Sequence, residues 1–129
     1  MELHNNKKGA TKNILSGNVG SKGYIEGKCF INDAGKIPPK DKGYILVSKF
    51  TNPELLPLMI NAAGIITEIG GKLSHAAILA RELGIPCAVA VENATKLLKD
   101  SDLVVLDARE IPAIVYKKEN ANILKILRE

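Results

Sequence analysis

The chain has 129 residues, enough for one domain with its own core but too few for two ordinary domains. Hydrophobic residues make up 46% and charged residues 25%, which argues against a disordered or fibrous protein. The net charge is +4, and the basic residues are scattered along the chain. No apolar run approaches the roughly 18 residues of a membrane-spanning helix. We therefore predict a single cytoplasmic domain, with no nucleic-acid partner, no membrane association and no signal peptide.

The first third of the chain has the pattern of β-structure. Residues 1–16 are polar and aperiodic, so a flexible N-terminal tail is predicted there. Strands are predicted at 24–31 and 44–48 because apolar and β-branched residues are bounded by glycine and proline turns. The segment 32–35, reading NDAG, is typical of a turn between them.

Helical spacing begins at Thr51. Thr51 or Asn52 is expected to cap a helix here, since a Thr-x-x-Glu capping box runs from Thr51 to Glu54 and Pro53 suits the first turn. We expect Gly64 to end this helix. A short buried strand is predicted directly after it, at 65–67.

A second helix is predicted from Ser74 to Leu83. The pair Gly70–Gly71 turns the chain into it, and Gly84 ends it. The remaining predictions are strands at 87–91, 103–107 and 113–116, a helical turn at 94–98, and a helical extension at 118–129. A β-rich first third followed by strand-helix-strand units predicts a compact α/β domain over residues 17–117.

The two cysteines, Cys29 and Cys87, form no CxxC or Cys/His ligand spacing. Reduced, buried thiols are therefore predicted in place of a disulfide or a metal site. A metal at the centre of the chain would need further ligands, and Glu68 and Glu82 are the carboxylates that lie near it in sequence. We predict no bound metal.

His75 stands directly behind the double glycine and at the start of the second predicted helix. An imidazole has an unperturbed pKa of about 6.5, so near neutral pH much of it is uncharged and able to attack phosphorus. The amides of a helix N-terminus favour an added phosphate, and Ser74 could cap the helix or bond the imidazole. A histidine that merely caps a helix fits the same position, so local chemistry leaves both interpretations open.

Two other readings of the double glycine fail on spacing. A Walker loop requires glycine and a hydroxyl residue where this chain has Ile66 and Leu73. Ser74 lacks the G-x-S-x-G frame of a serine hydrolase. The motif is therefore not a nucleotide cradle or a nucleophilic serine elbow.

The stretch TEIGGKLSHAAILARELGIPCAVAV resembles the phosphohistidine, or swivelling, domain of the PEP-utilising enzymes, which include pyruvate phosphate dikinase, PEP synthase, enzyme I of the sugar phosphotransferase system and rifampicin phosphotransferase. The stretches GNVGSKGYIEGKCFI, TNPELLPLMINAAGIITE and SDLVVLDAREIPAIVY resemble its entry strand, its preceding helix and strand, and its closing strands. The resemblance covers roughly Gly17 to Lys117.

This resemblance implies a mobile β/β/α domain whose histidine accepts a phosphoryl group at one active site and delivers it at another. His75 matches the phosphorylated histidine, and Gly70 and Gly71 match the turn that supports the phosphate, with Ser74 beside it. An ATP-grasp-like domain, holding ATP and Mg²⁺, is the implied donor. A domain that binds PEP, pyruvate or another acceptor is the implied destination.

Other matched positions have less definite roles. Arg81 matches the family's arginine, but it lies about 120° around the helix from His75, so we expect it to contact a partner or a nearby carboxylate. Thr51 and Glu68 are candidates for supporting groups around the histidine, with solvent-facing caps as the alternative. Leu73 stands where many relatives have threonine, which puts a regulatory role for that position in doubt.

No part of the 129 residues corresponds to a donor or an acceptor domain, so we expect a component that binds no cofactor itself and is incomplete as an enzyme. The hypotheses are a stand-alone phosphocarrier with partners on separate chains, a piece of a larger phosphotransferase, and a non-catalytic swivelling interaction module. The methionine at the start and the helical segment at the end favour the first.

Overall fold

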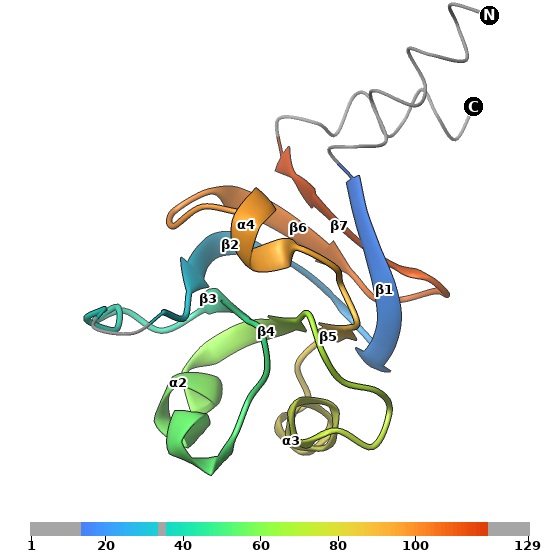
Figure 1. Ribbon diagram of the computed structural model, residues 1–129, viewed down its shortest axis with the longest axis horizontal. Coiled ribbons are helices and arrows are strands. Elements are labelled where there is room, and N and C mark those ends of the chain that lie inside the picture. Colours follow the sequence, from blue (N-terminus) through green and yellow to red (C-terminus); the bar gives the residue numbers. More distant parts are fainter. Residues whose placement is uncertain (1–13, 34–35, 119–129) are drawn as a thin grey trace, which may run out of the picture.

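A computed structural model describes residues 14–33 and 36–118 (Figure 1). The predicted terminal helix, Lys118 apart, and most of the predicted tail lie outside these ranges. The described elements are β1 (Ile14–Ser21), β2 (Tyr24–Ile31), β3 (Tyr44–Ser48), the 3-10 helix η1 (Pro53–Leu55), α2 (Leu56–Ile60), β4 (Ala62–Thr67), α3 (His75–Leu83), β5 (Cys87–Val89), α4 (Ala94–Leu97), β6 (Leu103–Asp107) and β7 (Ala113–Lys117).

The strands close into a barrel in the order β1-β5-β4-β3-β2-β6-β7, with β7 paired to β1. The strands β2, β3, β4 and β5 are parallel to their neighbours among themselves, whereas the pairings of β1, β6 and β7 are antiparallel. Helices α2 and α3 lie against the side formed by β3, β4 and β5, away from β6 and β7 (Figure 1). The predicted α/β class is confirmed, in a single small domain whose closed barrel carries α2 and α3 on one side.

Alternate side chains of the central strands enter two different cores. In β3, Ile45 and Val47 point into the barrel, while Tyr44 and Leu46 pack on the helical side. All four are buried, because both faces of this strand are covered. This double burial explains why the stretch 44–48 is apolar without the alternation of a half-exposed strand.

Short side chains let α3 lie close to the sheet. Ala76, Ala77 and Ala80 are buried on the face of α3 that meets β1 and β5. A Cβ placed on Gly20 of β1 would lie only 3.2 Å from the Cβ of Ala77. Gly84, with φ of 72°, ends the helix in the left-handed conformation, as predicted.

The expected end of the first helix at Gly64 is wrong. The helix α2 stops at Ile60, and Gly64 lies inside β4. A Cβ at Gly64 would approach Ile25 Cγ2 to 2.9 Å and Leu106 Cδ2 to 3.1 Å. The glycine is therefore needed for space inside the barrel. The helical pattern of the residues before it gives no sign of this role.

Two further boundaries differ from the predictions. Residues 14–16, expected in the flexible tail, belong to β1 and pair with β7. The predicted strand 87–91 ends at Val89, because Ala90 adopts a positive φ of 58° that a strand cannot continue.

Candidate functional site

His75 is the first residue of α3, and its side chain is exposed. Thr51 Oγ1 lies 3.1 Å from His75 Nδ1, so one ring nitrogen is held in a hydrogen bond. In the part of the chain that the structure describes, no hydrogen bond engages Nε2. The first amides of a helix lack intrahelical partners and carry partial positive charge, which favours an anion at this end of α3.

The loop before His75 is fixed by its own residues. Gly70 has φ of 137°, and a Cβ there would lie 3.1 Å from both Cβ and Oγ of Ser74. Ser74 Oγ donates to the carbonyl of Gly71 at 2.7 Å and accepts from the amide of Ala77 at 3.4 Å. Ser74 thus caps the helix, which is the first of its two expected roles. The Cβ position of Gly71 opens onto empty space.

Of the two expected cap residues, Thr51 and Asn52, it is Asn52 that caps the helix. The side chain of Asn52 accepts a hydrogen bond from the amide of Glu54 at 2.9 Å and begins η1. The hydroxyl of Thr51 is therefore not used at the helix end and reaches His75 instead. The structure brings these two predicted residues together.

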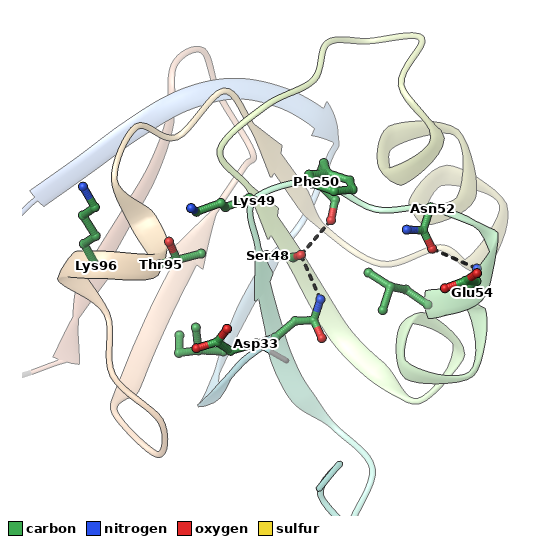
Figure 2. Close-up of a pocket in the computed structure, with 11 residues that line it drawn as sticks. Asp33, Ser48, Lys49, Phe50, Asn52, Glu54, Thr95 and Lys96 are labelled. Carbon is green, nitrogen blue, oxygen red and sulfur yellow. Dashed lines mark hydrogen bonds between the residues drawn. The ribbon is translucent and has the colours of Figure 1, made fainter. Parts of the chain in front are cut away.

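Thr51 lies on a segment that is held by the end of β3. Ser48 Oγ donates to the carbonyl of Phe50 at 2.6 Å and accepts from Asn32 Nδ2 at 3.2 Å (Figure 2). These residues border a cleft of about 500 Å³ at the carboxyl ends of β2 and β3. Neither Ser48 nor Asn32 was predicted from the sequence as a functional residue. A serine that ends an otherwise apolar strand is the signal that points to Ser48.

Glu68 anchors another element. Its carboxylate accepts hydrogen bonds from the amide of Thr95, at 2.9 Å, and from the Thr95 hydroxyl. Burial acts to raise the pKa of Glu68, but the two bonds from Thr95 and the charges of Lys49 and Lys96 outweigh it and lower the pKa below its ordinary value. Glu68 therefore stays ionised at neutral pH and ties the loop after β4 to the first turn of α4.

Among the residues that the structure describes, Arg81 forms no ion pair with a carboxylate, which was one of its two expected contacts. Its Nη1 donates to the backbone carbonyl of Gly20 at 2.7 Å. The bond joins α3 to β1, so within the described structure Arg81 fixes the helix that begins with His75.

Large apolar side chains are exposed around the histidine. Leu73, two residues before His75, is 85% exposed, and Phe50, next to Thr51, is 54% exposed. Ile78 follows His75 by about one helical turn, and Ile69 precedes the double glycine; both are also exposed. We call Phe50, Ile69, Leu73 and Ile78 the apolar collar. Exposed apolar side chains on the segments next to a reactive group favour contact with another protein surface.

The cysteines take no part in this site. Both are buried free thiols, as predicted, and burial raises the pKa of each to about 12. Such thiols are unreactive at neutral pH. Within residues 14–33 and 36–118, no group of three or more His, Cys, Asp or Glu side chains is placed to hold a metal ion. The helices of that part are too short or too polar to cross a bilayer.

The chain is similar in sequence to known proteins. Residues 40–111 match the family model described as the mobile domain of PEP-utilising enzymes. The chain is 43% identical over 116 residues to the phosphoenolpyruvate synthase of Pyrococcus furiosus, an alignment that covers 84% of this chain and 14% of that protein. It is 40% identical over 90 residues to the rifampicin phosphotransferase of Bacillus subtilis, covering 70% of this chain and 10% of that protein.

A solved structure agrees with these relatives. The solution structure of an Enzyme I protein aligns with a TM-score of 0.52 and 29% identity, over 67% of this chain and 36% of that one. The chain thus spans only a small part of the length of the curated relatives that it matches.

Proposed function

Because the chain belongs to the family of mobile domains of PEP-utilising enzymes, we propose that it is a phosphocarrier whose His75 takes a phosphoryl group from one active site to another. One observation carries this proposal: an exposed histidine begins α3, behind Gly70–Gly71, with Thr51 bound to one ring nitrogen. A histidine needed only for packing would be buried or would be bound at both nitrogens.

We propose Nε2 as the nucleophile. When the ring proton is on Nδ1, the Nδ1–H group donates to Thr51 Oγ1 and the lone pair of Nε2 is available. Attack on the donor forms the Nε2–P bond as a P–O bond of the donor breaks, and the leaving oxygen keeps the electron pair. The proton stays on Nδ1, where Thr51 stabilises the positive charge that develops on the ring.

The surroundings of His75 suit a transferable phosphate. The start of α3 offers backbone amides, and the open space beside Gly71 lets a phosphorylated ligand approach the loop. Within the described residues, no hydrogen bond or ion pair engages Nε2. The phosphoryl group of a carrier must leave as readily as it arrives.

We propose that other domains supply the donor and the acceptor; the alignments support this, since they cover only 14% and 10% of the lengths of the two relatives above. We propose an ATP-grasp-like domain with ATP and Mg²⁺ as the donor, and a domain that binds PEP, pyruvate or another acceptor as the destination. The apolar collar is the surface that we propose to meet both. Docking there would exclude water from Nε2 during transfer.

The test is transfer of phosphate to the chain. The wild-type chain, His75→Ala and a control, His4→Ala, which removes the other histidine of the chain, are incubated with an ATP-grasp-like partner domain, ATP and Mg²⁺. Acid-labile phosphate is followed by intact mass. We expect one phosphate on wild type and His4→Ala, and none on His75→Ala. Equal labelling of wild type and His75→Ala contradicts the proposal. So does absence of label when the partner phosphorylates another phosphohistidine domain, a result that supports a non-catalytic interaction module.

A further inference from the structure

We infer that Ser48 is a positioning residue for His75 and acts through Thr51; this inference rests on the proposed phosphocarrier function. Ser48 is the last residue of β3 and is only 3% exposed. It has no hydrogen bond to the histidine. Its role follows from the two chain segments that it holds, one bearing Thr51 and the other leading to His75.

The side chain of Ser48 fixes the first segment. Its hydroxyl donates to the carbonyl of Phe50 at 2.6 Å, and Asn32 Nδ2 donates to the same hydroxyl at 3.2 Å (Figure 2). The carbonyl of Phe50 and the amide of Thr51 belong to one planar peptide group. A bond that holds that carbonyl therefore restricts the direction from which Thr51 leaves the backbone.

The backbone at the same place fixes the second segment. The carbonyl of Ser48 accepts from the amide of Glu68 at 3.1 Å, and the carbonyl of Lys49 accepts from the amide of Ile69 at 2.9 Å. From Ile69 the chain passes through the double glycine to His75. One end of β3 thus fixes both sides of the Thr51–His75 contact.

The contact that Ser48 supports is sensitive to small movements. Hydrogen bonds of this kind usually have donor–acceptor distances of about 2.7–3.2 Å, and the Thr51–His75 distance of 3.1 Å is near the upper end of that range. Phe50 and Thr51 belong to no strand or helix, although Lys49 bonds to Ile69 before them and Asn52 caps η1 after them. Without the Ser48 hydroxyl, we expect Thr51 to move away and the imidazole to lose its preference for the tautomer with the proton on Nδ1.

Loss of this hydroxyl should not unfold the protein. Asn32 is half-buried and Phe50 is exposed, so water can replace Ser48 as their partner. Ser48→Ala retains the backbone bonds of β3. Ser48→Thr retains the hydroxyl and suits a strand.

The experiment uses the full 129-residue chain and no partner protein. Nitrogen NMR of the His75 ring reports the tautomer, and the small phosphorylating reagent phosphoramidate reports the rate and the position of phosphorylation. We expect Ser48→Ala to mix the two tautomers, to lower the rate at Nε2 about fivefold and to add phosphate at Nδ1. Ser48→Thr should behave as wild type. Ser21→Ala, which removes a buried serine hydroxyl outside this network, should also leave the ring spectrum unchanged.

A wild-type ring spectrum and wild-type reactivity in Ser48→Ala would overturn the inference. If Ser48→Ala fails to fold, Asn32→Ala decides instead, because it removes the donor to Ser48 from a half-exposed position. A shift of the tautomers in Asn32→Ala supports the inference, and an unchanged spectrum overturns it. Because the reagent needs no partner, these results do not depend on whether a partner domain can transfer phosphate to the chain.

Discussion

Thr51 Oγ1 lies 3.1 Å from His75 Nδ1, although 24 positions separate the two residues in the chain. The contact exists because β3 and β4 are adjacent and parallel, which places their carboxyl ends at the same edge of the barrel. Thr51 follows β3 and the loop to His75 follows β4. The nucleophile is therefore oriented from a neighbouring strand as well as by its own helix.

Removing the Thr51 hydroxyl should slow phosphorylation without unfolding the domain. We expect Thr51→Val to lower the rate at which a donor domain phosphorylates His75 about five- to tenfold, because one hydrogen bond to the ring is lost. Its free energy of unfolding should change by less than about 0.5 kcal/mol, since the residue is half-exposed. Thr51→Ser is the control and should stay close to wild type. A wild-type rate in Thr51→Val would show that the bond does not assist transfer.

The two glycines before His75 should differ in their response to alanine. Gly70→Ala should lower the free energy of unfolding by about 1–3 kcal/mol, because φ is 137° and the added Cβ would meet Ser74 at 3.1 Å. Gly71→Ala should cost less than about 0.5 kcal/mol, because its Cβ meets nothing within 4 Å. Urea unfolding of both variants checks the pair. Equal losses would mean that the loop does not have the conformation described.

The local signals around α3 are strong enough to be recognised in sequence. Ser74 as a cap, Gly84 as a left-handed end and the double glycine as a turn each act on the few residues beside them. The apolar stretch at β3 likewise predicts a buried strand. These features depend on backbone chemistry within a few positions. The family resemblance and the bounds of α3 could therefore both be recognised before the fold was known.

The partners of His75 depend instead on strand order. The sequence offered both Thr51 and Asn52 as the helix cap; Asn52 takes that role, and the Thr51 hydroxyl lies against His75 instead. Gly64 looked like a helix end, yet it makes space for Ile25 and Leu106 from distant strands. Close approaches of this kind depend on which strands are neighbours, and the order of strands in the barrel cannot be inferred from local sequence patterns.

Substitution of Arg81 shows whether this arginine stabilises the domain itself or contacts a partner. Its bond to the Gly20 carbonyl predicts that Arg81→Met lowers the free energy of unfolding by about 1 kcal/mol, because the attachment of α3 to β1 is weakened. Arg81→Lys keeps the charge but not the planar fork and should recover only part of the loss. Urea denaturation measures both. Unchanged stability together with slower transfer from a donor domain would assign Arg81 to the partner interface instead.

Asp100 should make stability depend on pH in the acid range. The hydrogen bond from Lys36, at 2.5 Å, lowers the pKa of Asp100 below its ordinary 3.8; partial burial opposes this shift, and the bond from the Ile31 amide adds to it. A carboxyl whose pKa is lower in the folded state stabilises the fold above the unfolded pKa and loses that effect as pH falls through the folded pKa.

Asp100→Asn should therefore be less stable than wild type at neutral pH, and the difference should shrink below about pH 4. Urea unfolding between pH 3 and pH 7 measures this. Asp41→Asn, in the exposed loop before β3, is the control and should follow wild type across the range. A gap between wild type and Asp100→Asn that stays constant into acid would rule out the ion pair as its source.

Thr67 offers a way to stabilise the domain from beneath the His75 loop. The residue is fully buried at the end of β4, and its hydroxyl has no hydrogen-bond partner among the residues that the structure describes. A buried hydroxyl without a partner costs about 1–3 kcal/mol, and valine has nearly the same shape and favours strands. Thr67→Val should therefore raise the free energy of unfolding by about 1 kcal/mol and the melting temperature by about 5 °C.

Thr67→Ser removes the methyl group but keeps the hydroxyl, so it shows which of the two groups affects stability. It keeps the polar atom and loses apolar contact, so it should be less stable than wild type in a thermal melt. The hydroxyl also lies beneath the double glycine, since a Cβ on Gly70 would be 3.6 Å from Thr67 Oγ1. If Thr67→Val is destabilised and its His75 labels more slowly, the hydroxyl must bind the loop or a water beneath it, and the loop before the nucleophile would then be supported from the barrel as well as by Ser74.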